Sequence, residues 1–320
     1  MSVKHPIIAV TGSSGAGTTT VRHVFTDIFR REAVNTVYVD GDSFRRFDRD
    51  TMRSAFRASL AEGSPISHFG PESNLLDRLE GLFREYSRTG TGLIRRYAGN
   101  AVRAETLGIP AGTFTPWTEI CDGTDLLFYE GLHGGCIEAT WSHRHMSPSH
   151  NPFVVQARHR LETQYDTGVD VAQWVDLLIG VVPSINLEWI QKIHRDTTLK
   201  GASCEGVVET ILRRMPDYVR YITPQFSLTD INFQRVPLVD TSDPFVTRDV
   251  PTLAESILVV RFRNPGRHDF PDLLKRLPGA FMSRPNTLVV PGGQMEHALR
   301  VICTPLVHEL VERMRGSREL

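Results

Sequence analysis

The chain has 320 residues, 40% of them hydrophobic, which is enough for one large core or two closely packed lobes. Lys and Arg number 36 against 37 Asp and Glu, so the net charge of −1 excludes the global positive field of a nucleic-acid-binding protein. The four cysteines form no C-x-x-C pair, and no stretch approaches 18 apolar residues, so no zinc site, disulfide framework or membrane span is indicated. These features predict a soluble, reduced, cytoplasmic protein.

The first predicted elements are a buried strand at 6–10, a glycine turn and an amphipathic helix over 19–31. Further apolar runs predict strands at 36–44, 125–131, 176–189, 237–243, 256–263 and 287–293. Helical patterns lie at 77–86 and 295–314, and the polar, glycine-rich stretch 87–115 is expected to be a loop.

Strands that alternate with helices after an opening strand–loop–helix unit are typical of a doubly wound α/β domain with a mostly parallel or mixed central sheet. Residues 139–166 break this rhythm and hold four of the twelve histidines, which predicts a surface insertion. The His143-x-His145 pair within it is a candidate metal site, but it has no Cys or carboxylate partner at ligand spacing.

Residues 12–19, GSSGAGTT, fit the phosphate-loop pattern G-x-x-x-x-G-K-[ST] except that Thr18 replaces the lysine. The glycines let backbone N–H groups point at phosphate oxygens, and the positive end of the following helix adds to the attraction. Thr19 stands where the loop hydroxyl binds Mg²⁺. A plain glycine turn is the alternative. If the chain is an enzyme, another cation must supply the charge that Thr18 lacks.

Two acids follow predicted strands, at the sheet edge where α/β proteins bind ligands. Asp42 follows the second strand, and Glu130 ends the run LLFYE. We interpret Asp42 as functional and Glu130 as an Mg²⁺-organising carboxylate. The alternatives are a helix N-cap, a role that Asp40 or Asp48 would fill as readily, and a solvated strand-end acid.

Two basic segments complete the pattern. Arg46, Arg49 and Arg53 recur at helical spacing, which suits a second phosphate on the acceptor or else a solvated helix face. Residues 186–201 offer several cations around an aspartate and are interpreted as a lid that replaces the missing lysine. Although HRD at 194–196 matches a protein-kinase loop, Gly201 stands where that loop needs Asn, so a protein kinase is rejected.

Nine blocks of the sequence together resemble the bacterial phosphoribulokinase family, in order and over nearly the whole chain apart from 139–166. They are GSSGAGTTTV, GDSFRRFDR, SHFGPESN, LLFYEGLHG, IGVVPSINLEWIQKIHRD, ILRRMPDYV, PQFSLTDINFQRVPLVDTSDPF, VVRFRNP and MSRPNTLVVPGG. The resemblance implies a single P-loop kinase domain over 1–320. It also implies phosphorylation by MgATP of the C1 hydroxyl of ribulose 5-phosphate, giving ribulose 1,5-bisphosphate for carbon fixation in the Calvin cycle. That family also lacks the loop lysine.

The resemblance assigns roles residue by residue. Asp42 matches the catalytic base, Glu130 the acid near Mg²⁺ and the γ-phosphate, and Asp196 a second catalytic carboxylate, while Lys192 is the candidate for the missing charge. The implied ATP-binding residues are Gly12, Ser13, Ser14, Gly15, Ala16, Gly17, Thr18, Thr19 and Thr20. The implied metal ligands are Thr19 and Glu130. The implied substrate-binding residues are Arg49, Arg53, Tyr97, His133, Arg195 and Lys200.

The resemblance also implies regulation and assembly. The bacterial family is similar in this respect: its members are octamers that NADH activates, so the resemblance implies the same here. The arginines assigned to NADH binding match Arg31, Arg214, Arg261 and Arg284. The thiol switch of the plant enzymes is unsupported, because no cysteine lies in or near the phosphate loop.

Three positions depart from the family pattern: Arg45 and Gly99 stand where histidines are usual, and Lys200 replaces an arginine and loses bidentate phosphate binding. They leave open a kinase for another sugar phosphate or for a nucleoside. A non-catalytic ATP- or NADH-binding regulator is the third hypothesis, although a binding protein has no need of a catalytic base.

Overall fold

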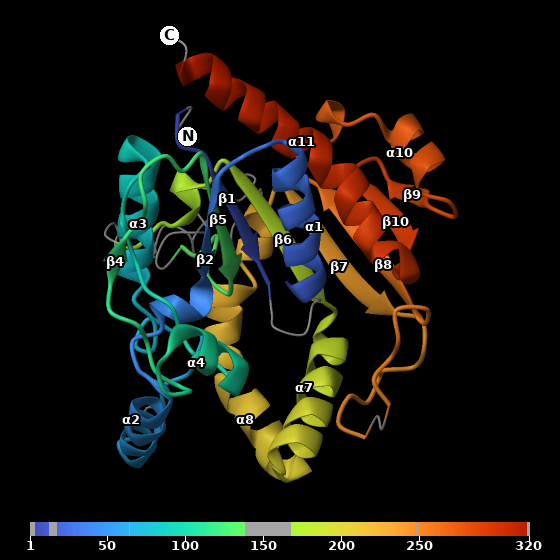
Figure 1. Cartoon of the computed structure of the whole chain (residues 1–320). Helices are drawn as coiled ribbons and strands as arrows, with labels where there is room; N and C mark the ends of the chain where they lie inside the picture. The colour runs from blue at the N-terminus through green and yellow to red at the C-terminus, as the bar shows by residue number, and fades with distance from the viewer. Residues whose placement is uncertain (1–3, 13–17, 64, 138–167, 247–248, 319–320) are drawn as a thin grey trace, which may run out of the picture. The chain divides into compact units, whose positions relative to one another are not determined.

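The computed structural model describes residues 4–12, 18–63, 65–137, 168–246 and 249–318 (Figure 1). Its strands are β1 Ile7–Thr11, β2 Thr36–Asp40, β3 Leu93–Ile94, β4 Thr118–Glu119, β5 Leu126–Gly131, β6 Leu177–Pro183, β7 Ile231–Pro237, β8 Ser256–Phe262, β9 Phe281–Arg284 and β10 Thr287–Pro291. Its α-helices are α1 Thr18–Arg31, α2 Arg49–Ala61, α3 Leu76–Thr89, α4 Ala101–Leu107, α7 Ile185–Lys200, α8 Cys204–Asp217, α9 Gln225–Leu228, α10 Phe270–Arg276 and α11 Met295–Arg318.

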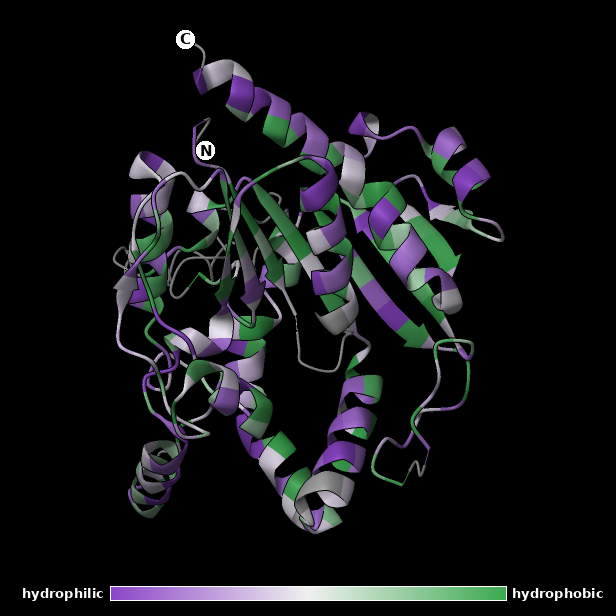
Figure 2. Ribbon diagram, in the orientation of Figure 1, coloured by the Kyte–Doolittle hydropathy of each residue, from purple (hydrophilic) through white to green (hydrophobic). Residues whose placement is uncertain are grey.

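The long strands form an eight-stranded mixed sheet in the order β2-β5-β1-β6-β7-β8-β10-β9. β6 and β7 are parallel, with Ile179 opposite Ile231, whereas β7–β8, β8–β10 and β10–β9 are antiparallel. β1 and β6 are buried along their whole length, as their uninterrupted apolar sequences require (Figure 2). The predicted α/β fold is therefore confirmed.

The described chain divides into two compact units. Unit 1 comprises residues 1–9, 37–176 and 216–228, and unit 2 comprises residues 10–36, 177–215 and 229–320. The prediction of one domain over 1–320 stays a prediction, and the predicted insertion at 139–166, with His143 and His145, lies wholly outside the described residues.

Unit 1 contains β2, β5 and the helices α2, α3, α4 and α9. Its core gathers apolar side chains of α3 and β5, where the rings of Phe83 and Tyr129 pack edge to face with centroids 5.5 Å apart. In unit 2, α11 packs along α1, α10 and β10. Among the described residues, none of the helices combines the length and apolar content that crossing a membrane requires.

Several predicted segments differ from the structure. The strand expected at 176–189 ends at Pro183, because α7 begins at Ile185. The stretch 87–115 was expected to be a loop, but it contains β3 and α4. α4 forms because Asn100 accepts a hydrogen bond from the Arg103 N–H at its start, and Gly108 ends it in the left-handed conformation. The strand expected at 237–243 is also misplaced, since β7 ends at Pro237.

Candidate active site

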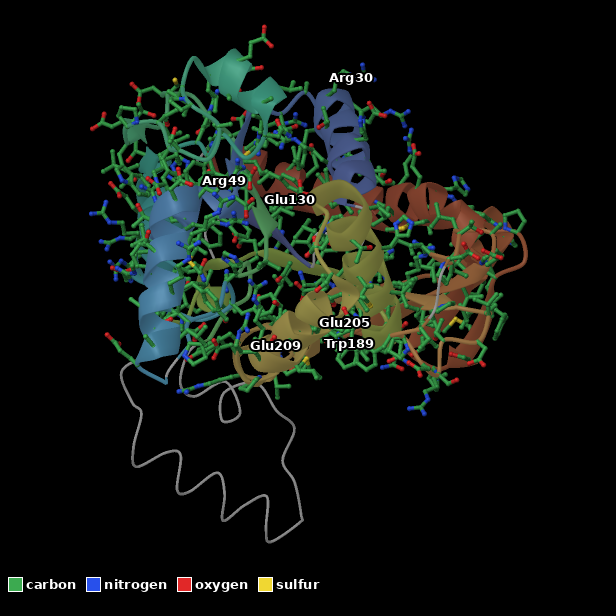
Figure 3. All side chains as sticks on the ribbon, turned by 90° about the horizontal axis from the view of Figure 1, so that it is seen from below. Arg30, Arg49, Glu130, Trp189, Glu205 and Glu209 are labelled. Atoms are coloured by element: carbon green, nitrogen blue, oxygen red, sulfur yellow. The ribbon has the colours of Figure 1, made fainter. Side chains whose placement is uncertain are left out.

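The acids predicted for the site lie on neighbouring backbone segments of unit 1. Asp42 follows β2 in a short 3-10 turn over Gly41–Phe44, and Glu130 lies near the end of β5 (Figure 3). A Cβ atom added to Gly41 would lie 2.8 Å from the Cα of Gly131 and 2.6 Å from the Oη of Tyr129. Only glycine permits this close approach, which places the backbone before Asp42 against the backbone after Glu130.

Asp42 is a half-exposed carboxylate in an ion pair. The Oδ1 of Asp42 lies 2.7 Å from the Nη2 of Arg45, and 41% of the Asp42 side chain is exposed. Desolvation by surrounding protein raises the pKa of Asp42, and the positive charge of Arg45 opposes that rise. The nearby carboxylate of Asp40 raises the pKa further, so the group is a stronger base than an isolated aspartate.

The capping roles considered for this segment belong to the neighbouring aspartates. The Oδ1 of Asp40 accepts the N–H of Asp42 at 3.0 Å, and its Oδ2 pairs with Arg103. Asp48 is the N-cap of α2, and its Oδ1 accepts a hydrogen bond from the N–H of Thr51 at 2.7 Å. Asp42 does not cap the 3-10 turn, because Asp40 is its N-cap.

Arg45 is itself held in place by aromatic and basic neighbours. Its guanidinium lies over the ring of Tyr97, 5.2 Å from the centroid. Arg95 donates hydrogen bonds to the carbonyls of Arg45 and Ser43 and lies 3.7 Å from the ring centroid of Phe114. Tyr97, predicted to bind substrate, thus contacts the partner of Asp42.

The predicted basic face after Asp42 forms only in part. α2 begins at Arg49, so Arg46 lies outside the helix, and its guanidinium donates to the carbonyls of residues 71, 72 and 74. The Nη2 of Arg49 donates to the carbonyl of Gly99 at 2.6 Å. Arg53 is exposed and pairs with Asp50 at 3.2 Å. The expectation of one face was wrong for Arg46, because the Asp48 cap starts the helix later.

His133 is buried in unit 1. Its Nε2 lies 2.8 Å from the carbonyl oxygen of Phe69, and burial lowers its pKa to about 4. The ring is therefore neutral at pH 7 and donates its Nε2–H to that carbonyl. This contact anchors the segment SHFG at 67–70, which Ser67 also fixes through a 2.6 Å hydrogen bond to Asp217.

In unit 2 the strand and helix around the predicted phosphate loop are present. β1 ends at Thr11, and α1 begins at Thr18 and continues through Thr19 and Thr20. A Cβ atom added to Gly12 would lie 2.0 Å from the carbonyl oxygen of Val181, so no side chain fits there. The assignments to Ser13, Ser14, Gly15, Ala16 and Gly17 lie outside the described residues, as do the side chains of Thr18 and Thr19.

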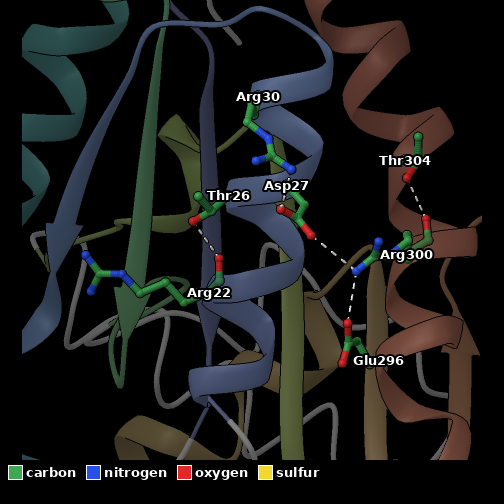
Figure 4. A network of polar contacts seen from close by, with 7 residues as sticks. All are labelled: Arg22, Thr26, Asp27, Arg30, Glu296, Arg300 and Thr304. Atoms are coloured by element: carbon green, nitrogen blue, oxygen red, sulfur yellow. Dashed lines mark hydrogen bonds and ion pairs between the residues drawn. The ribbon is translucent and has the colours of Figure 1, made fainter.

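The helix after the phosphate loop is anchored to the C-terminal helix. Figure 4 shows Asp27 of α1 paired with Arg300 of α11 at 3.4 Å, and Arg300 in turn paired with Glu296 at 2.9 Å. Directly after α1 ends, the Oε2 of Glu32 lies 3.0 Å from the Nδ1 of His308. These contacts fix α1 against α11.

The residues predicted to form a lid lie on the helix α7, also in unit 2. The Nζ of Lys192 is 2.6 Å from Oδ2 of Asp196, whose Oδ1 lies 3.2 Å from the Nε of Arg195. Burial lowers the pKa of Lys192, the Asp196 carboxylate opposes this, and the charge of Arg214 lowers it further. Lys192 and Arg195 therefore both place positive charge on Asp196. The side chain of Lys200, the last residue of α7, is not among those described.

Comparisons with known proteins identify the family. The sequence pattern described as "Phosphoribulokinase / Uridine kinase family" matches residues 7–147 and 160–242. The chain belongs to this family. It is 52% identical to a phosphoribulokinase of Rhizobium meliloti (strain 1021) over 98% of both chains, and 50% identical to the chromosomal phosphoribulokinase of Cupriavidus necator over 100% of both. The solved phosphoribulokinase of Rhodobacter spheroides superposes with a TM-score of 0.81 at 46% identity, covering 98% of this chain and 100% of that chain.

The resemblance drawn from sequence motifs is thus confirmed at the level of the family and its P-loop kinase fold. Motif reasoning did not find the ion pair of Asp42 with Arg45, or the place of Arg214 near Lys192. The glycines beside the two acids, Gly41 and Gly131, were the available signal for a close backbone approach.

The four arginines matched to an effector all belong to unit 2. Arg31 ends α1, Arg284 ends β9, and Arg261 of β8 donates to Thr229 at 3.1 Å. Arg214 lies in the last turn of α8 and acts on Lys192 electrostatically. A role in effector binding stays a prediction for all four.

Proposed function

We propose that this chain is a phosphoribulokinase, which transfers the γ-phosphoryl group of MgATP to the C1 hydroxyl of ribulose 5-phosphate. The products are ADP and ribulose 1,5-bisphosphate. The observation that carries the proposal is the full-length identity of about 50% to relatives named phosphoribulokinase. The position of Asp42 supports it, because a half-exposed carboxylate stands at the end of a sheet strand.

In this proposal Asp42 accepts the proton of the C1 hydroxyl. The hydroxyl oxygen forms a bond to the γ-phosphorus as the bond from that phosphorus to the β-γ bridging oxygen breaks, and ADP leaves. Surrounding protein and Asp40 raise the pKa of Asp42, which strengthens the base. Arg45 keeps the carboxylate oriented in the absence of substrate through its 2.7 Å contact.

The nucleotide side of the reaction is assigned to unit 2. Backbone N–H groups of residues 12–20 and the first turn of α1 bind the phosphates, and Lys192 supplies the charge that a loop lysine usually provides. Position 12 requires glycine, because a side chain there would meet the carbonyl oxygen of Val181 and displace the start of the proposed loop. Arg49, Arg53, Arg195 and Lys200 are proposed to hold the acceptor.

Magnesium is proposed to bind with ATP through Thr19 and Glu130. Among the described residues, no three His, Cys, Asp or Glu side chains gather into a metal site. That arrangement fits Mg²⁺, which takes most of its ligands from waters and substrate phosphates rather than from a protein cage. When bound, the ion neutralises charge on the β- and γ-phosphates.

Assembly, location and regulation follow from family resemblance alone. We propose a cytoplasmic homo-octamer that NADH activates through Arg31, Arg214, Arg261 and Arg284. Subsaturating ATP with and without NADH tests this regulation: equal velocities in the two conditions contradict it. Mass measurement in solution tests the octamer.

The test of the function is ADP release with ribulose 5-phosphate, ribose 5-phosphate and uridine as acceptors. Ribulose 5-phosphate is expected to give the highest kcat/KM, and preference for either other acceptor would contradict the proposal. Asp42→Asn is expected to lower kcat by about 10²-fold or more with little change in ATP affinity. Asp48→Asn is the matched control, because Asp48 only caps α2 and asparagine also caps. If Asp42→Asn keeps normal turnover while Asp196→Asn abolishes it, the two carboxylates exchange roles.

A further inference from the structure

The helices α7 and α8 share a small apolar cluster in unit 2. Ile193 of α7 and Val207 and Ile211 of α8 are buried together, and Trp189, Cys204, Val208 and Phe245 pack against them. Of these side chains, Phe245 alone comes from outside the two helices. The two helices therefore depend on Phe245, from outside the pair, for part of their shared apolar packing.

Phe245 belongs to the segment 238–246 that follows β7, which we call the strut segment. Its ring stacks on the indole of Trp189, with centroids 5.3 Å apart and planes 23° apart. One turn earlier on α7, the Nδ2 of Asn186 donates to the carbonyl of Thr241 at 2.8 Å. The strut segment therefore contacts α7 in its first two turns, the part of the helix before Lys192.

The strut segment is itself braced at both contact points. Ser242 donates its N–H to Oδ1 of Asp240 at 2.9 Å, which fixes the turn that presents the carbonyl of Thr241. Phe245 donates its N–H to Oδ1 of Asp243 at 3.0 Å, which fixes the turn that presents the ring. Each contact with α7 thus comes from a turn locked by an aspartate.

We infer that the strut segment holds α7 in one rotational setting, and that Phe245 is a positioning residue for Lys192 and Asp196. This inference rests on the proposed function for the roles of those two side chains. Lys192 lies three residues after Trp189, less than one helical turn. A rotation of the helix about its axis at Trp189 therefore turns Lys192 by the same angle.

The geometry sets the size of the effect. Side-chain tips lie about 5–6 Å from a helix axis, so a rotation of about 20° moves them by about 2 Å. A misplacement of about 1 Å at a reacting group costs up to about 10²-fold in rate. Removing the Phe245 ring leaves a gap beside Trp189 into which α7 can turn, and Lys192 and Asp196 turn with it.

The test compares Phe245→Ala with Phe281→Ala in the full chain. Phe281 is the matched control, because it is 55% exposed on β9 and lies outside the cluster. Phe245→Ala is expected to lower kcat about tenfold in the ADP-release assay while KM for ATP changes less than twofold. In a Lys192→Met background the same substitution is expected to lower kcat by a smaller factor than in the wild-type background, because one of the two groups it positions is gone. Phe245→Leu, which restores much of the lost volume, is expected to recover most of the activity.

Amide hydrogen exchange provides a readout independent of activity. Phe245→Ala is expected to speed exchange over residues 188–200 by about tenfold and to leave α1 unchanged. Unchanged kcat, an equal loss of kcat in the Lys192→Met background, or unchanged exchange in α7 would each overturn the inference. If the wild-type chain does not phosphorylate ribulose 5-phosphate, the proposed function fails, and the exchange experiment still decides whether the strut segment holds α7.

Discussion

Gly12→Ala tests the packing that the structure assigns to the start of the phosphate loop. The new methyl carbon would lie 2.0 Å from the carbonyl oxygen of Val181 and 3.1 Å from its carbonyl carbon. A close carbon–oxygen contact needs about 3.3 Å, so the backbone must shift by about 1.3 Å. Val181 cannot yield easily, because it lies opposite Phe233 in the parallel pairing of β6 with β7. The displacement therefore falls on the loop after β1.

The expected cost follows from that overlap. Overpacking a core by one methylene costs about 1–3 kcal/mol, and this clash is with backbone rather than with a flexible side chain, so we expect about 3 kcal/mol. Urea unfolding gives the stability, and titration calorimetry gives ATP affinity, which we expect to fall at least about tenfold. Gly81→Ala is the matched control: Gly81 lies inside α3 with no atom within 4 Å of the added carbon. That variant is expected to gain about 0.5–1 kcal/mol. If Gly12→Ala unfolds at the wild-type urea concentration and binds ATP normally, the packing argument is wrong.

Three further predictions concern titrating groups. Arg45→Gln removes a charge that lowers the pKa of Asp42, so the acidic limb of the kcat–pH profile should move to higher pH; an unmoved limb would show that Asp42 is not the titrating base. His133 has a pKa of about 4 against an ordinary 6.5, so its neutral burial should cost about 3 kcal/mol of stability as pH falls from 6.5 to 4. His133→Gln should lose less stability than wild type over that range in urea unfolding, and parallel curves would refute this. Glu32 raises the pKa of His308, so the contribution of their pair is full below about pH 6.5 and is lost as pH rises through the raised value. The stability difference between wild type and His308→Gln should therefore shrink from pH 6 to pH 9, as thermal unfolding can measure.

The parts of the molecule that the sequence predicts are those in which one local rule acts alone. Buried strands must be apolar throughout, so β1, β5 and β6 are visible as uninterrupted runs. The acids that follow such runs, Asp42 and Glu130, were located by the same rule. The helix α4 was missed because it has no buried apolar face. The stretch 87–115 is polar, and α4 depends instead on the caps Asn100 and Gly108.

Contacts that join distant residues leave a trace in the sequence only where backbones meet. Gly41 and Gly131 approach so closely that any side chain would collide. This close backbone approach therefore requires glycine at both positions beside the two acids, and the sequence shows those glycines. The pairing of Arg45 with Asp42, and of Trp189 with Phe245, imposes no such requirement, because many other residues would fit each position. Asn186 and Thr241 lie 55 residues apart, and neither residue type points to the other. If the strut segment sets the orientation of α7 as inferred, the predicted phosphate loop is visible in the sequence, whereas the contacts that align the predicted lid are visible only in the fold.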